Sequence, residues 1–136
     1  MDQDELLDLL QRSSLETQYK AMSRAVDWLS TRRYITSETT TIAGQAIDLA
    51  QREKRPELLL SVALMLVPDG WNGDVSFGKA LKRSVLFSPT FVAYGDEPSI
   101  EAEHEAPAIA LTMAAIKTRP RRTRRVQLLS SNDASA

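Results

Sequence analysis

The sequence predicts an α+β protein in which N-terminal helices precede a small antiparallel sheet packed against two apolar helices. Three observations lead to this class. Apolar residues recur at helical spacing through residues 1–55, short β-branched and aromatic segments follow Gly70, and one apolar run lies on each side of these segments. We expect one globular domain over residues 1–118, made of a helical part at 1–55 and an α-β-α part at 56–118.

Composition limits the chemistry available to the chain. It has 136 residues, of which 43% are hydrophobic and 26% charged, and these values are typical of a globular domain. There is no cysteine, which excludes disulfides, thiolate metal sites and a cysteine nucleophile. The acidic start lacks the basic and apolar regions of a signal peptide, so we expect a cytoplasmic protein.

Charge is distributed unevenly along the chain. The net charge is −1, but six basic residues and one acidic residue are found from Lys117 onward. The residues before Lys117 therefore include 11 basic and 17 acidic side chains, which is −6, whereas the remainder is +5. We expect residues 119–136 to form a basic, disordered tail.

The N-terminal part predicts two helices before residue 34. Ser13 and Glu16 fit a capping box that opens the second helix. The first helix is indicated by four leucines after the acidic start: Leu6, Leu7, Leu9 and Leu10. The second has the clearest amphipathic stripe in the chain: Leu15, Tyr19, Met22, Val26 and Leu29. This stripe either packs within the chain, which we favour, or forms a seam between subunits.

Residues 34–41 are rich in β-branched side chains and predict a loop or a strand. A third helix is expected after them and ends near Lys54, although Gly44 weakens it by about 1 kcal/mol. Its expected apolar face consists of Ile42, Ala46, Leu49 and Ala50.

The central apolar run, from Leu58 to Val67, is interrupted by a single serine and predicts a buried helix. Pro56 suits its first turn, and residues 68–70 (Pro-Asp-Gly) end it. Eleven residues from Glu57 span roughly 16 Å, which is short of the ~30 Å of a bilayer. We expect this helix to be covered on most sides, with five side chains in the core: Leu58, Leu59, Leu64, Met65 and Leu66.

Short segments of strand type follow the turn and predict two or three antiparallel strands. They comprise Trp71, 74–77, 85–87 and 91–94. Residues 101–105 are interpreted as a solvated acidic turn. Pro107 then opens a second apolar helix that ends near Thr118. Its small face, expected to allow close approach of another helix, is formed by Ala106, Ala110 and Ala114.

Residue clusters that suggest catalysis or metal binding are weak. His104, the only histidine, lies among glutamates, but one imidazole in a solvated turn does not predict a metal site. Asp69 and Asp74 flank Trp71 and are interpreted as turn residues rather than as a catalytic carboxylate pair. The glycines do not form a phosphate-binding loop. We therefore predict no catalytic residue, cofactor or metal.

L-M-L-V-P-D-G-W at residues 64–71 leads into the strands, and E-A-P-A-I-A-L-T-M-A-A-I-K-T-R at 105–119 follows them. This order resembles a group of small uncharacterised phage and prophage proteins. In that group a helix ending in L-V-P-x-G-W precedes a β-meander, and a T-P-A-L-A-L-x-x-A-A-L helix closes an α-β-α sandwich. Ala106 stands where the group has a capping Thr, and the residues before Glu57 lie outside the resemblance. The resemblance implies an origin and a fold, and no residue role.

The basic tail is the strongest feature outside the core. Its arginines suit nucleic acid phosphates or an acidic protein surface, and the alternative is a solubilising tail. The tail has no interleaved aromatic residue, so base stacking is not predicted. The candidate contact residues are Arg119, Arg121, Arg122, Arg124 and Arg125.

These observations lead to one preferred function and two alternatives. We expect a non-enzymatic phage or prophage accessory protein that binds a host or phage protein, such as one of host defence, in the cytoplasm of an infected or lysogenic bacterium. The first alternative is a nucleic-acid-associated protein that uses the tail. The second is a hydrolase or transferase whose site the sequence does not reveal. A homo-oligomer stays open, and a membrane partner is not expected.

Overall fold

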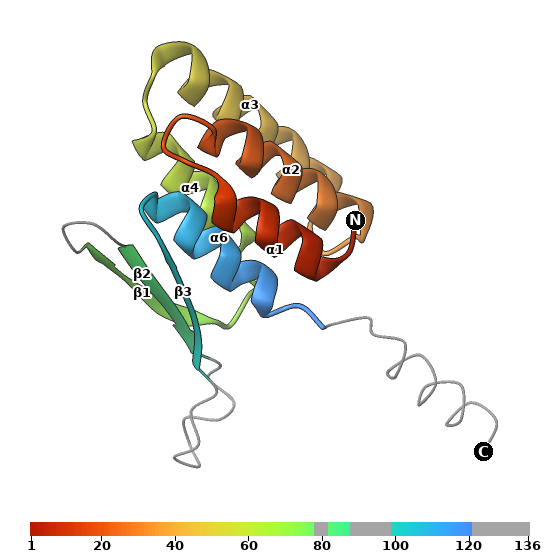
Figure 1. Cartoon of the computed structure of the whole chain (residues 1–136). Coiled ribbons are helices and arrows are strands. Elements are labelled where there is room, and N and C mark those ends of the chain that lie inside the picture. The colour runs from red at the N-terminus through yellow and green to blue at the C-terminus, as the bar shows by residue number, and fades with distance from the viewer. Residues whose placement is uncertain (78–81, 88–98, 121–136) are drawn as a thin grey trace.

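The fold is described from a computed structural model of the chain (Figure 1). The structure describes residues 1–77, 82–87 and 99–120, with the backbone alone at 72–77, 82–87 and Ser99. These residues are rich in helix, as the sequence predicts. The elements are α1 (Gln3–Arg12), α2 (Gln18–Thr31), α3 (Ser37–Glu53), α4 (Glu57–Leu66), β1 (Asn72–Phe77), β2 (Lys82–Phe87), β3 (Ser99–His104) and α6 (Pro107–Lys117).

Helix α1 is amphipathic and begins at a side-chain cap. The Asp2 carboxylate accepts a hydrogen bond from the Glu5 N–H at 2.8 Å, which satisfies one of the free donors of the first turn. Leu6 and Leu10 are fully buried one turn apart. The apolar face of α1 is therefore fixed against the rest of the helical core.

The capping box predicted at Ser13 is wrong. The Ser13 hydroxyl donates to the Leu10 carbonyl at 2.6 Å and closes α1 instead of opening α2. Ser14 organises the turn, since its hydroxyl accepts from the N–H groups of Glu16 and Thr17, both at 3.2 Å. Because α1 continues to Arg12 and a turn follows, α2 begins only at Gln18.

The stripe predicted on α2 packs within the chain over most of its length. Met22, Val26 and Leu29 are buried by other parts of the same chain. Leu15 precedes the helix and is 52% exposed, so it does not belong to the core. The buried face is wider than the stripe, because it also contains Ala21, Ala25 and Trp28.

The loop or strand predicted at residues 34–41 is wrong over its second half, where α3 begins. The Thr36 hydroxyl accepts from the Thr39 N–H at 3.1 Å and caps the helix. Thr40 and Thr41 donate their hydroxyls to carbonyls one turn back. The hydroxyls of these β-branched residues are thus satisfied within the helix.

The apolar face predicted on α3 is confirmed at Ala50, holds in part at the half-buried Ala46, and is wrong at Ile42 and Leu49. The buried positions are Ala43, Ile47 and Ala50, whereas Ile42 and Leu49 are 44% and 37% exposed. Helix α3 packs on both α2 and α4, and two alanines together with Ile47 fill its buried face. Ile42 and Leu49 lie beside this face and not in it.

Helix α4 has the predicted bounds to within one residue, but it is not covered on most sides. Leu59 and Leu66 are fully buried, as predicted. Leu58 is half-buried, and Leu64 and Met65 are 60% and 40% exposed. The helix therefore has one buried face, completed by Val62 and Ala63, and one apolar face directed to solvent.

The strands form one antiparallel sheet in the order β1-β2-β3. The register places Val75 opposite Ser84 and Ser84 opposite Ala102. Strand β3 replaces the solvated turn that the sequence predicts at 101–105. Its side chains alternate, with Ala102 and His104 buried and Glu101 and Glu103 exposed. The strand predicted at 91–94 lies outside the described residues.

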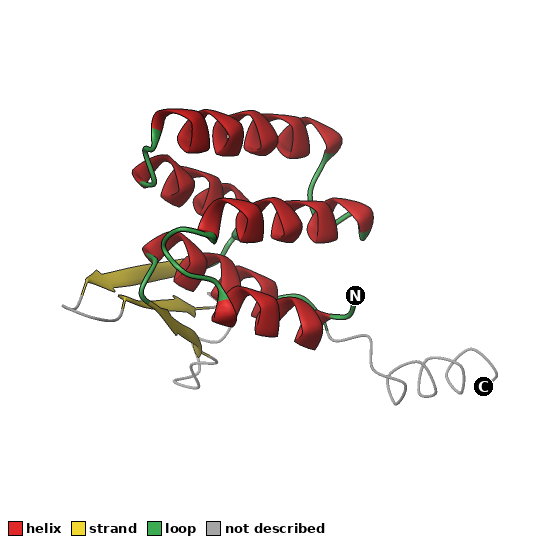
Figure 2. Ribbon diagram, turned by 45° about the horizontal axis from the view of Figure 1, so that its top comes forward, coloured by secondary structure: helices red, strands yellow, loops and turns green. Residues whose placement is uncertain are grey.

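Helix α6 occupies the middle of the molecule between the sheet and the other helices (Figures 1 and 2). Every side chain from Ala108 to Ile116 is buried. The predicted small face of Ala106, Ala110 and Ala114 is fully buried. These small residues let α6 pack closely on α4, β2 and β3 at once.

Candidate functional site

Arg119, predicted as the first contact residue of the tail, is held by the folded chain. Its guanidinium donates from Nη2 to the Leu66 carbonyl at 2.9 Å and lies 5.1 Å from the centre of the Tyr34 ring. Its own carbonyl accepts from Gln3 Nε2 at 3.2 Å. Burial lowers the pKa of the guanidinium, and the charge interaction with Tyr34 opposes this effect. Arg119 is therefore a packing residue at the carboxyl ends of α4 and α6.

The surroundings of Arg119 form an end cluster, which we define as Arg119, Tyr34, Trp28, Arg32 and Met1. The Arg32 guanidinium lies 4.1 Å from the centre of the Trp28 ring, and the Trp28 and Tyr34 ring centres are 6.0 Å apart. The Met1 carbonyl accepts from Trp28 Nε1 at 3.1 Å and from Arg32 Nη2 at 2.6 Å. Alternating cations and aromatic rings can bind nucleobases, but here they bind one another and the N-terminus.

The other four predicted contact residues lie outside the described residues: Arg121, Arg122, Arg124 and Arg125. Their chemistry therefore stays a prediction from the sequence. Arg119 does not belong with them, because its guanidinium is committed to Leu66 and Tyr34.

His104 is buried in a structural position and not in a solvated turn. Its Nε2 lies 2.8 Å from the Ser13 carbonyl, and its Nδ1 accepts from the Ala106 N–H at 2.9 Å. This pair of partners fits the neutral ring with the proton on Nε2, which donates to Ser13. His104 thus ties the end of β3 to the link between α1 and α2.

Among the described side chains, the glutamates around His104 do not form a metal site. Across residues 1–77, 82–87 and 99–120, no three histidine, aspartate or glutamate side chains are grouped to hold a metal ion. Asp69 is exposed in the turn before Gly70, which has a φ of 88°. Trp71 is half-buried against the core, and the Asp74 side chain lies outside the described residues.

A groove of about 330 Å³ lies between α1 and α2. Its floor is apolar, with Ala21 buried and Leu9 half-buried. Its lining is completed by Arg12, Ser13, Thr17, Lys20 and Arg24. Ser13, whose carbonyl accepts from His104, forms the wall at the link between the helices. The groove is therefore built on packed elements and combines an apolar floor with a polar rim.

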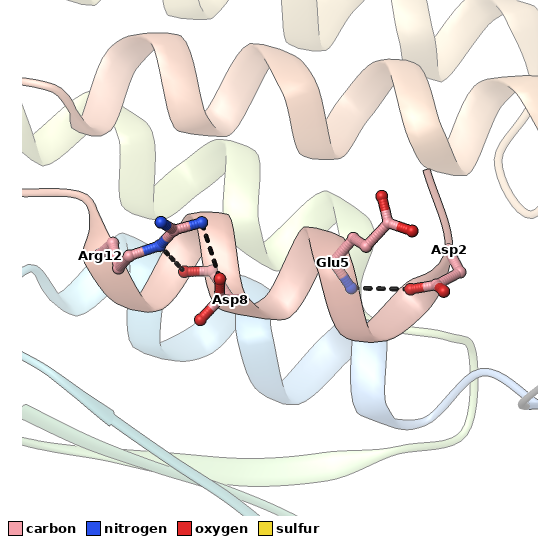
Figure 3. A network of polar contacts seen from close by, with 4 residues as sticks. All are labelled: Asp2, Glu5, Asp8 and Arg12. Carbon is pink, nitrogen blue, oxygen red and sulfur yellow. Dashed lines mark hydrogen bonds and ion pairs between the residues drawn. The ribbon is translucent and has the colours of Figure 1, made fainter.

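Every charged side chain that lines the groove is a cation. Arg12 pairs with Asp8 at 2.7 Å on the exposed side of α1, which offsets its charge (Figure 3). Lys20 and Arg24 form no side-chain hydrogen bond or ion pair with any described residue. The α2 wall is thus positive and the α1 wall close to neutral.

Lys20 and Arg24 lie one turn apart on α2, and like charges at this spacing destabilise a helix by a few tenths of a kcal/mol. Such a pair stands out in a body whose sequence is acidic overall. The sequence places both residues off the apolar stripe, but it does not show that α1 lies beside them. The sequence does contain one signal of the groove. It is the pair of cations at i and i+4, Lys20 and Arg24, with no acidic residue between them.

Comparison of the chain with protein-family models, curated protein sequences and solved structures gives no match. The arrangement of the side chains therefore carries the functional argument.

No helix in the described part of the chain has the length and apolar character needed to cross a membrane.

Proposed function

We propose that this chain is a non-enzymatic phage or prophage accessory protein that binds a partner protein of the host or phage through the groove between α1 and α2. The observation that carries the proposal is the combination of an apolar floor at Leu9 and Ala21 with two cations, Lys20 and Arg24, that have no partner among the described side chains. Peptide segments supply both matching features, since they present apolar side chains and carboxylates together. The phage origin rests on the resemblance of residues 57–119, and the cytoplasm of the host is the compartment that fits it.

The frame of this proposal is the α+β class with its α-β-α part. Support comes from three antiparallel strands that pack on α6, and from α4 on another side of that helix. Within this frame the groove is lined by residues of the helical N-terminal part and by none of the residues that carry the resemblance. We therefore assign the proposed binding function to residues 9–24 and not to the α-β-α part.

Nucleic acid binding is the second candidate, and the +5 charge from Lys117 onward favours it. The lining of the groove favours it less, because phosphates gain nothing from an apolar floor. The two candidates use different parts of the chain, so they can be tested separately.

The direct test places a photo-crosslinking amino acid at Thr17, which is exposed and lines the groove. The matched control places it at Thr41, which is also exposed but lies on α3. After irradiation in a nuclease-treated lysate of the bacterial host, we expect a discrete protein adduct at Thr17 and none at Thr41. Absence of any discrete adduct at Thr17, or the same adducts at both positions, rejects the proposed function.

A further inference from the structure

The two walls of the groove differ in charge, and this difference determines which face of a bound segment lies against α2. On α1, Arg12 is offset by Asp8 at 2.7 Å. On α2, Lys20 and Arg24 are exposed and have no partner among the described side chains. A ligand with one acidic face gains most when that face meets α2 and avoids Asp8.

The spacing of Lys20 and Arg24 indicates the form of the ligand. Lys20 and Arg24 are separated by four residues of helix, which is a rise of about 6 Å. On a second helix, two carboxylates at i and i+4 are separated by the same distance along the helix axis. Such a helix also places a side chain at i+1 or i−3 beside its acidic face, where it can reach a groove floor.

The floor selects an apolar side chain for that position. Leu9 and Ala21 are the non-polar lining residues, and the volume of about 330 Å³ is large enough for a leucine- or phenylalanine-sized group. Burial of one such group contributes more free energy than an exposed ion pair, because solvent screens the charges of the pair. The apolar group would thus supply most of the affinity, and the carboxylates would fix the orientation of the bound helix in the groove.

We infer that the groove binds an acidic amphipathic helix of a partner protein. Carboxylates at i and i+4 pair with Lys20 and Arg24, and an apolar side chain beside them lies on Leu9 and Ala21. This inference rests on the proposed function and adds the chemistry of the partner segment. Charge complementarity commits the groove to this occupant, because a basic segment, including residues 119–125 of this chain, is repelled by the same cations.

The probe is a fluorescein-labelled, lactam-stapled 16-residue helix with glutamates at i, i+4 and i+8 and leucines along the adjacent face. One control peptide replaces glutamate by glutamine, and a second replaces leucine by serine. Binding is followed by fluorescence anisotropy to the full chain at low and moderate salt. We expect both control peptides to bind at least about tenfold more weakly, since 1.4 kcal/mol corresponds to that factor.

The variant that tests the site is Lys20→Glu with Arg24→Glu. The matched control is Arg52→Glu with Lys54→Glu, which changes the net charge equally at exposed positions near the end of α3. We expect the groove variant to lose at least about tenfold in affinity for the acidic probe and the control variant to lose about twofold or less. Circular dichroism melts ensure that both variants are folded.

Four outcomes overturn the inference. The acidic probe binds the groove variant as tightly as the unaltered chain, or the glutamine peptide binds as tightly as the glutamate peptide. A third outcome is that the serine peptide binds as tightly as the leucine peptide and that a 16-bp DNA duplex displaces the probe. The groove would then recognise charge alone. A discrete adduct at Thr17 together with failure of the acidic probe rejects this inference and leaves the proposed function standing.

Discussion

At the scale of single residues, Arg119 and His104 change their meaning between sequence and structure. Both look like surface groups in the sequence, one in a basic tail and one in an acidic turn. In the structure each joins elements that are far apart in the chain. Arg119 joins the end of α6 to Leu66 and Tyr34, and His104 joins β3 to Ser13. Both are therefore sites where a substitution acts on stability.

We predict that Arg119→Ala lowers the free energy of unfolding by about 1–3 kcal/mol. The change removes the charged donor to the Leu66 carbonyl and the contact with the Tyr34 ring. Urea denaturation measures the loss. Truncation provides the matched pair, since a chain ending at Pro120 keeps Arg119 and one ending at Thr118 does not. Equal melting temperatures for the two truncated chains would contradict the anchoring role.

We predict that His104→Ala costs about 2–4 kcal/mol of stability. It leaves the Ser13 carbonyl and the Ala106 N–H without their ring partner in a buried setting, and it opens a cavity. Chemical denaturation followed by circular dichroism measures the effect. Glu103→Ala is the control on the same strand, because that side chain is exposed, and its cost should stay within about 0.5 kcal/mol. Comparable costs for the two variants would place His104 at the surface.

At the scale of elements, α4 shows that an apolar sequence does not have to be buried all round. Its residues are apolar from Leu58 to Val67 apart from Ser61, yet one face is directed to solvent. The helix contacts α3, α6 and, to a lesser extent, α2. Three partners on adjacent sides cannot cover the opposite side of a cylinder, so Leu64 and Met65 stay exposed.

We predict opposite results for one substitution at two positions of α4. Leu59→Asp places a charge in a fully buried site and should cost several kcal/mol, comparable with the stability of the whole domain. Leu64→Asp, at a side chain that is 60% exposed, should change stability by about 0.5 kcal/mol or less. Thermal melts of the two variants decide this. If Leu64→Asp unfolds the chain, the exposed face of α4 is covered in solution.

The stripe of α2 gives the second prediction at this scale. Met22 is fully buried by its own chain and accepts at Sδ from the Thr112 hydroxyl at 3.1 Å. Met22→Glu should therefore lower stability by several kcal/mol without a change in molecular mass. Light scattering beside a thermal melt measures both quantities. A shift from oligomer to monomer with an unchanged melting temperature would instead assign the stripe to a subunit contact.

At the scale of the whole molecule, charge is divided between two regions of opposite sign. The body before Lys117 is −6, and the groove between α1 and α2 is a local positive site within it. The basic residues from 121 onward follow a chain end that Arg119 holds against the folded body. A partner protein and a nucleic acid would thus meet different surfaces of the molecule.

This division alters the salt dependence expected of nucleic acid binding. With Arg119 committed to the fold, four arginines are left for phosphates: Arg121, Arg122, Arg124 and Arg125. Log affinity for duplex DNA should then fall with log salt at a slope of about −3.6, so a fourfold rise in salt weakens binding about 150-fold.

Fluorescence anisotropy on a labelled duplex measures this slope. A chain that ends at Pro120 should lose the binding and keep its melting temperature, because Arg119 is retained. Absence of binding at low salt by the full chain would remove the nucleic acid candidate and leave the groove as the functional surface.

The sequence by itself determined the features that depend on neighbouring residues. The bounds of α4 and α6 follow from Pro56, Pro107 and the apolar runs after them, and the amphipathic stripe of α2 follows from its helical spacing. These signals are local, since a proline and a periodic pattern act over one or two turns. The helix-rich character of the chain follows from the same signals.

Only the tertiary structure decided which apolar residues are buried and which polar residues come together. Leu59 and Leu64 are the same residue type in the same helix, and only the positions of α3 and α6 distinguish them. Arg12 and Arg24 form one groove because α1 folds back on α2, and Arg119 leaves the tail because Leu66 and Tyr34 lie within its reach. Burial and site formation depend on contacts between distant segments, and a single sequence contains no local signal for them.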